Sequence, residues 1–114
     1  MKIDLENSSR LYYSIKEVAG HFDVNESLLR YWETEFEIID PRKTETGTRQ
    51  YTVDDIQDIA LVYHLVKVKG LTLEGARQTL KQRKDEETRK LQIIQKLERI
   101  KKELQDMEKE FEGE

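Results

Sequence analysis

The 114-residue chain contains no cysteine, and this absence excludes several kinds of chemistry. Without a thiol there is no disulfide, no cysteine-ligated zinc, no cysteine nucleophile and no thiol-based redox sensing. Long apolar runs are missing too: none approaches the roughly 20 residues of a membrane-spanning helix. The opening MKIDLENSSR also lacks the apolar core of a secretion signal. We therefore expect a cytoplasmic chain with no membrane partner.

Residues that bind metals or perform catalysis are scarce as well. The two histidines, His21 and His64, have no companions at metal-ligand spacing, so we expect no metal and no cofactor. The acidic residues Glu33, Glu35 and Glu37 are interpreted as a solvated face, because an acid/base pair would need a pocket to shift its pKa values. The sequence predicts no catalytic residue and no enzymatic activity.

Charged residues, in contrast, are abundant: they make up 39% of the chain and leave a formal net charge of −4. Since phosphate binding is largely electrostatic, this balance argues against a nucleic-acid partner. The length allows one compact domain and an appendage, because domains usually span roughly 100 to 150 residues. We expect no room for a second effector domain.

Two helices separated by a short turn are predicted near the N-terminus. Ser14 and Glu17 stand at the spacing of a capping box, which predicts a helix over residues 15–22. Asn25 is a favourable N-cap for a second helix, in which apolar residues recur at helical spacing: Leu28, Leu29, Trp32 and Phe36. Only residues 23–25 intervene, and Asp23 tolerates a left-handed backbone. This pattern is typical of a helix-turn-helix.

The segment RKTETGTRQYT that follows is polar and has Gly47 at a turn position, which predicts a β-hairpin wing. Thr52 then caps a third helix that closes around Lys67, Lys69 and Gly70, and Thr72 caps a shorter fourth helix. Residues 81–88 form a charged connector without a core residue. The sequence leaves open whether this connector is a continuous helix or a bend.

Large apolar residues recur near the C-terminus in alternating steps of four and three, the period of a coiled-coil seam. They are Ile93, Leu97, Ile100, Leu104, Met107 and Phe111. A lone helix of this length is marginal in water, so we expect it to dimerise with a second copy. The predicted organisation is a flexible N-terminus (1–10), a winged helix-turn-helix domain (11–81) and a dimerisation coiled-coil helix (82–114). The fold class is mainly α, with four helices and a small hairpin before the coiled-coil helix.

Four segments in this order resemble the MerR family of bacterial transcription regulators: YYSIKEVAGHFDVNESLLRYWETEF, TRQYT, VDDIQDIALVYHL and KGLTLEGARQTL. The resemblance extends from Tyr12 to about Leu80. It implies an antiparallel coiled-coil homodimer that binds double-stranded promoter DNA and bends or untwists it, with RNA polymerase as a candidate partner. Family sensors usually carry a ligand-binding segment after the coiled coil, so either this chain has no effector or the sequence is a fragment.

The resemblance places Glu26, Ser27, Arg30 and Tyr31 at the DNA face and sets Arg49 and Tyr51 against phosphate. Further DNA-binding residues are predicted from their charge or from their position at a helix end. The predicted DNA-binding residues are Lys16, Asn25, Glu26, Ser27, Arg30, Tyr31, Arg42, Lys43, Arg49 and Tyr51. Asn25 and Ser27 stand by the positive end of a helix dipole, where anions bind. Trp32 replaces a tyrosine common in the family, so we interpret it as a core anchor.

Two other functions are compatible with these patterns. A helical adaptor would use a vestigial winged helix and the coiled coil to bind another protein, with its acidic surface keeping it off DNA. An excisionase-like architectural protein would bend DNA without regulating a promoter. Arg30 also has an alternative role, because Glu26 and Glu33 lie within reach on its own helix.

Overall fold

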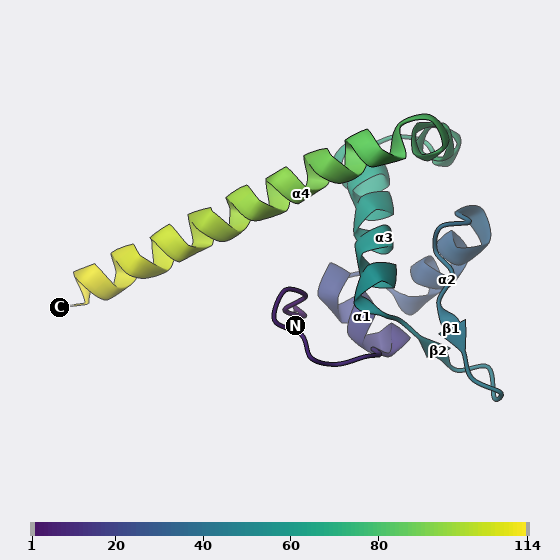
Figure 1. The fold of residues 1–114 in the computed structure, drawn as a ribbon, viewed down its shortest axis with the longest axis horizontal. Helices are drawn as coiled ribbons and strands as arrows, with labels where there is room; N and C mark the ends of the chain where they lie inside the picture. Colours follow the sequence, from purple (N-terminus) through teal and green to yellow (C-terminus); the bar gives the residue numbers. More distant parts are fainter. Residues whose placement is uncertain (1, 114) are drawn as a thin grey trace. The chain divides into compact units, whose positions relative to one another are not determined.

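The computed structural model describes residues 2–113, and its elements confirm the predicted fold class: a mainly helical chain with one antiparallel hairpin (Figure 1). In chain order they are α1 (Ile15–Phe22), α2 (Glu26–Glu35), β1 (Arg42–Lys43), β2 (Arg49–Gln50), α3 (Val53–Tyr63), the π-helical turn η1 (His64–Val68) and α4 (Leu73–Glu112). The chain forms two compact units, Met1–Arg77 and Gln78–Glu114. The finer domain boundaries expected from the sequence stay a prediction.

Helix α1 begins and ends as its sequence predicts. The Ser14 hydroxyl accepts a hydrogen bond from the Glu17 amide (3.1 Å), and the Glu17 carboxylate accepts one from the Ser14 amide (3.1 Å). At the other end Asp23 takes the left-handed conformation (φ 55°), and the Val24 amide donates to the Ala19 carbonyl. Only three residues separate the end of α1 from the start of α2, so the helix-turn-helix is confirmed.

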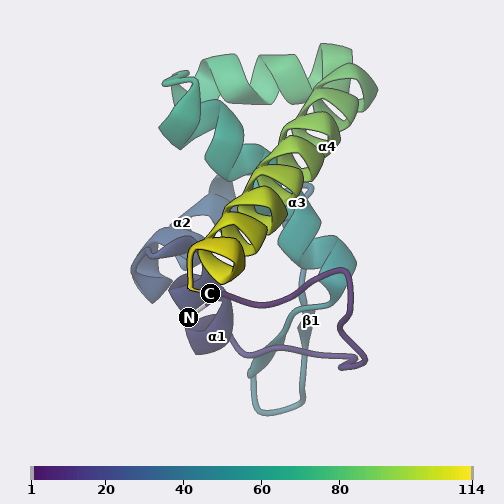
Figure 2. The same cartoon turned by 90° about the vertical axis from the view of Figure 1, so that its left-hand side faces the viewer.

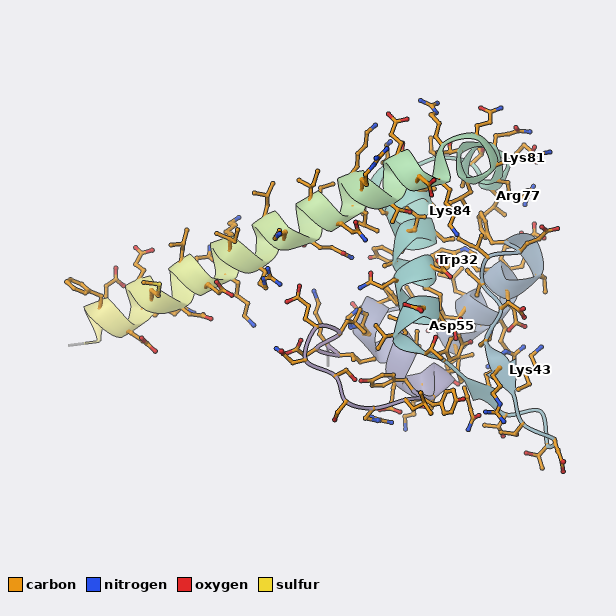
Figure 3. All side chains as sticks on the ribbon, in the orientation of Figure 1. Trp32, Lys43, Asp55, Arg77, Lys81 and Lys84 are labelled. Atoms are coloured by element: carbon orange, nitrogen blue, oxygen red, sulfur yellow. The ribbon has the colours of Figure 1, made fainter. Side chains whose placement is uncertain are left out.

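The core of the first unit lies where α1, α2 and α3 turn their apolar faces inward. Leu29 and Trp32 of α2 are buried, as are Val18 of α1 and Ile59 of α3. Trp32, labelled in Figure 3, lies in this core. Its ring packs edge to face with that of Tyr63 at the end of α3, with ring centroids 6.5 Å apart. The prediction that Trp32 anchors the core is confirmed, and the polar face of α2 is thereby directed outward.

The predicted wing is present as a short hairpin. Strands β1 and β2 are antiparallel, with Arg42 opposite Gln50 and Lys43 opposite Arg49. Gly47 has a φ of +85°, which an L side chain rarely adopts, so it is well suited to the turn. Backbone hydrogen bonds between Tyr13 and Tyr51 (2.8 and 2.9 Å) then tie the hairpin to the segment before α1.

Helix α3 starts at the predicted cap but ends differently from a regular helix. Thr52 and Asp55 form a capping box, with hydrogen bonds of 2.9 and 3.1 Å. The closing turn is π-helical, because the Lys69 amide donates to the His64 carbonyl five residues earlier. Gly70, with a φ of +73°, then ends the segment as expected.

Helix α4 resolves the choice left open for the charged connector. The Thr72 hydroxyl accepts a hydrogen bond from the Gly75 amide (3.0 Å), which confirms the predicted cap. At Arg83 the backbone leaves the helical region (φ −139°, ψ 34°), and α4 changes direction there (Figure 2). The expectation that residues 81–88 contain no core residue is wrong, because Glu87 is buried. Among the described residues, no helix has the length and apolar character of a membrane span.

Candidate nucleic-acid interface

The exposed side of α2 is polar and projects from a rigid base. Ser27, Arg30 and Tyr31 are exposed, and Tyr31 keeps 49% of its surface although it is adjacent to the buried Trp32. A guanidinium nitrogen of Arg30 lies 3.8 Å from a carboxylate oxygen of Glu26, a long and exposed ion pair of small energetic value. The predicted pairing of Arg30 with Glu26 is therefore present but weak, which leaves the guanidinium available to a ligand.

The N-terminal end of α2 opens into a hollow of about 550 Å³. Asn25 occupies the N-cap position, yet its side chain makes no capping hydrogen bond with α2. The hollow is lined by Asp23, Val24, Asn25, Ser27, Leu28 and Lys67. Lys67 is an addition to the predicted set. Sequence reasoning treated it only as the end of a helix, because its place beside α2 depends on the π-helical turn.

A partly buried ion cluster ties the wing to α2. Arg49 donates from Nε to Glu33 Oε1 (3.2 Å) and from Nη2 to Glu33 Oε2 (3.0 Å). Lys43 Nζ lies 3.3 Å from the same Oε2. Because Lys43 and Arg49 are register partners on adjacent strands, both reach the same carboxylate from one face of the hairpin.

The charges in this cluster stabilise one another. Burial alone would raise the pKa of Glu33, but the hydrogen bonds from Arg49 and Lys43 outweigh it and lower that pKa. The hydrogen bond to Glu33 likewise raises the pKa of Arg49. The interpretation of Glu33 as part of a solvated face is wrong, since its side chain is only 15% exposed. Glu35 also has a partner, Arg77, at 3.3 Å, whereas Glu37 is exposed as predicted.

Tyr51 does not lie on the wing surface. Two residues after Arg49, it points to the same side of the strand, and its ring is fully buried (0% exposed). Its hydroxyl finds no hydrogen-bond partner among the described residues, and burial raises its pKa to about 12. The expectation that Tyr51 meets phosphate is corrected: the strand's inward face makes it a core residue beneath Arg49.

The remaining predicted cations are exposed on other elements. Arg42 donates from Nη1 to the Tyr12 hydroxyl (2.8 Å), and its guanidinium lies 5.6 Å from the centre of the Tyr12 ring. Lys16 is exposed in the first turn of α1, while Glu26 is half-buried. Lys43, whose position on the hairpin is visible in Figure 3, is exposed as well.

The predicted seam of α4 is exposed along its whole length. The exposed fractions are 60% for Ile93, 60% for Leu97, 44% for Ile100, 60% for Leu104, 63% for Met107 and 79% for Phe111. Large apolar side chains this exposed, at coiled-coil spacing, are unusual on a solvent face.

Residues 13–83, which contain the helix-turn-helix and the wing, match the profile of the MerR HTH family regulatory proteins. The chain belongs to the MerR family. This MerR-family chain is therefore a DNA-binding transcription regulator, and regulators of the family are transcription factors rather than enzymes.

Solved structures show the same fold. A MerR-family transcriptional regulator from Bacillus cereus has a TM-score of 0.55 and 28% identity, over 87% of this chain and 79% of its own. HiNmlR, a MerR family regulator lacking the sensor domain and bound to promoter DNA, has a TM-score of 0.54 and 19% identity, over 89% and 88%. Among curated proteins no match was found.

Proposed function

We propose that this MerR-family regulator binds promoter DNA sequence-specifically as a homodimer, with α2 in the major groove and the wing along the adjacent backbone. The exposed polar face of α2 carries the proposal, because Ser27, Arg30 and Tyr31 project from a helix whose other side is fixed by Trp32. Side chains of this kind read base edges when a helix enters the major groove. The structurally similar HiNmlR is bound to promoter DNA, which supports DNA as the partner proposed for this chain.

The contacts divide into two groups. Asn25, Glu26, Ser27, Arg30 and Tyr31 are assigned to the groove at the N-terminal part of α2. Lys16, Arg42, Lys43 and Arg49 are assigned to phosphates, and Lys67 joins them because it lines the same hollow as Ser27. Tyr51 is buried and is assigned no DNA contact. These local cations offset the net charge of −4, which is a property of the whole chain.

The second copy is assigned to the exposed seam of α4. Each large side chain contributes about 1.5 to 3 kcal/mol when fully buried, so six per copy can stabilise a pair of helices that would be marginal alone. Pairing in antiparallel orientation would hold two α2 helices at a fixed separation, as two half-sites require. Bending or untwisting the promoter would then add specificity through DNA deformability and bring RNA polymerase to its elements.

Salt dependence tests the DNA-binding part, after the bound sequence has been selected from a random pool. A dimer that touches about six phosphates should lose affinity with log salt at a slope near −0.9 per phosphate. Arg30→Ala should weaken binding by about 1 to 3 kcal/mol and relax specificity if Arg30 reads a base. Lys102→Ala, at an exposed α4 position off the seam, is the control. Affinity insensitive to salt and to Arg30→Ala would favour the protein-binding adaptor.

Sedimentation tests the dimer. Leu97→Asp places a charge in the seam, so it should yield monomers with a folded first unit and roughly 100-fold weaker DNA binding, because the half-sites are no longer tethered. Lys102→Asp, which changes the charge more but lies off the seam, should remain dimeric. A Leu97→Asp protein that still sediments as a dimer would contradict the coiled coil.

The genomic distribution of bound sites and the shape of the bound duplex distinguish a promoter regulator from an excisionase-like architectural protein. A regulator should occupy promoters, and duplexes labelled at both ends should show a shorter end-to-end distance when bound. Sites clustered at recombination junctions, with the same bending, would favour the excisionase-like architectural role.

A further inference from the structure

The carboxylate of Glu33 lies between two wing cations that are themselves assigned to DNA. Arg49 uses its Nε and one Nη2 hydrogen to bind this carboxylate side-on, at 3.2 and 3.0 Å. A guanidinium has five N–H donors, so the edge formed by Nη1 and the second Nη2 hydrogen is not used by Glu33. That edge has the fork geometry that binds a phosphate through two parallel hydrogen bonds.

We propose that Glu33 is a positioning residue of the DNA interface, which holds Arg49 so that its outer edge meets a phosphate and keeps Lys43 beside it. This inference rests on the proposed DNA-binding function. It assigns to an acidic residue a favourable role in binding a polyanion, opposite to the role that its charge alone would give it.

The exposed fractions of the three side chains support this positioning role. The Glu33 side chain is 15% exposed, Arg49 is 22% exposed and Lys43 is 49% exposed, so the carboxylate is the least exposed of the three groups and Lys43 the most exposed. The cluster carries one negative and two positive charges and stays net positive. A phosphate that approaches from solvent therefore meets the cations before the carboxylate.

The hairpin needs such an anchor. Its strands are two residues long, and a two-stranded hairpin of this size is marginally stable on its own. Glu33 comes from α2, which Trp32 fixes in the core, so the ion pair transmits the position of the recognition helix to the wing. Arg49 is thereby ordered before DNA arrives, and less conformational entropy is lost on binding.

Glu33→Gln provides a test in which the two explanations differ in sign. If charge dominates, removal of a carboxylate near the backbone should tighten binding and steepen the salt slope. If Glu33 positions Arg49, the variant should bind about tenfold more weakly, with a slope shallower by about one phosphate. Glu37→Gln is the matched control, because it removes the same charge from an exposed residue just after the end of α2. This variant should bind DNA slightly more tightly.

Further variants separate positioning from loss of structure. In an Arg49→Ala background, Glu33→Gln should no longer weaken binding, because the residue that it positions is gone. Trp32 fluorescence during thermal unfolding reports whether the first unit is folded. If Glu33→Gln does not fold, Glu33→Asp replaces it, because aspartate keeps the charge but shortens the reach of the carboxylate. A positioning role predicts weaker DNA binding by Glu33→Asp, whereas an effect of charge alone predicts unchanged binding.

The possible failures are distinguishable. Wild-type protein that shows no salt-dependent DNA binding would remove the proposed function itself. Wild-type protein that binds DNA, together with Glu33→Gln binding as tightly as Glu37→Gln or more tightly, would overturn the positioning role alone.

Discussion

In the unit Met1–Arg77, apolar side chains such as Leu29, Ile59 and Leu65 are buried, whereas in the unit Gln78–Glu114 apolar side chains such as Leu97 and Leu104 are 60% exposed. Both units contain capped or regular helices, so helix formation does not distinguish them. The first unit has a core of its own, because its helices turn their apolar faces toward one another. In the second, the apolar stripe from Ile93 to Phe111 is exposed, which is the property expected of a surface that another chain completes.

The largest expected difference comes from one substitution made in both units. Ile59→Ala, at a fully buried position in α3, should lower the free energy of unfolding by about 2 to 5 kcal/mol, through lost burial and the cavity left behind. Ile100→Ala, at a 44% exposed seam position, should change it by less than about 0.5 kcal/mol while weakening the dimer. Trp32 is the only tryptophan, so its fluorescence in urea follows the first unit alone.

The two isoleucine substitutions should be compared at a protein concentration where the chain is monomeric. If both lowered the free energy of unfolding equally, the contrast between the two units would be wrong. Such a result would mean that the α4 stripe already contributes to the fold of a single chain.

A smaller effect is expected at Tyr51, where the first unit buries a polar atom. Its hydroxyl has no partner among the described residues, and a buried unsatisfied group typically costs about 1 to 3 kcal/mol. Tyr51→Phe should therefore raise the free energy of unfolding by about 1 kcal/mol. Tyr13→Phe is the matched control, because the Tyr13 hydroxyl bonds to Ser8 and its loss should not stabilise the chain. Destabilisation by Tyr51→Phe would indicate a hydrogen bond to bound water.

The smallest expected effect is a pH dependence confined to the first unit. The hydrogen bond from Arg10, helped by the Ser14 amide, lowers the pKa of Glu17 from 4.5 to about 2. Because the folded pKa is the lower one, the stabilisation is complete above pH 4.5 and is lost as the pH falls toward 2. Glu17→Gln should reduce this dependence in unfolding monitored by Trp32, with the part due to Glu33 remaining, whereas Glu108→Gln on α4 should leave it unchanged. Identical acid profiles for wild type and Glu17→Gln would contradict the assignment.

Local chemistry explains which features could be predicted from the sequence. The caps at Ser14 and Thr52 depend on groups three residues apart, and the left-handed Asp23 depends on its own side chain. The seam period depends on composition along one helix. The cap and turn signals are complete within a few residues and the seam lies within one helix, so the elements and the fold class followed from them.

The features that could not be predicted depend on pairing across the chain. Glu33 and Arg49 are 16 residues apart, and only the folded hairpin brings them together. The outward or inward direction of Tyr51 depends on which strand face packs against the core. A strand pattern gives the alternation of faces but does not say which face is buried in so short a hairpin. The assignment of individual DNA contacts stays a prediction for the same reason.

The π-helical turn at His64–Val68 acts as a built-in one-residue insertion. A π turn accommodates one residue more than an α turn, and each residue of an α-helix advances the direction of its side chain by about 100°. Deletion of one residue there would restore a regular helix and rotate Gly70, Leu71 and the Thr72 cap by about that angle. Chain length between α3 and Gly70 therefore sets the direction in which the polypeptide leaves this bundle of helices, so a one-residue deletion here should be far less tolerated than one at the Gly47 hairpin tip.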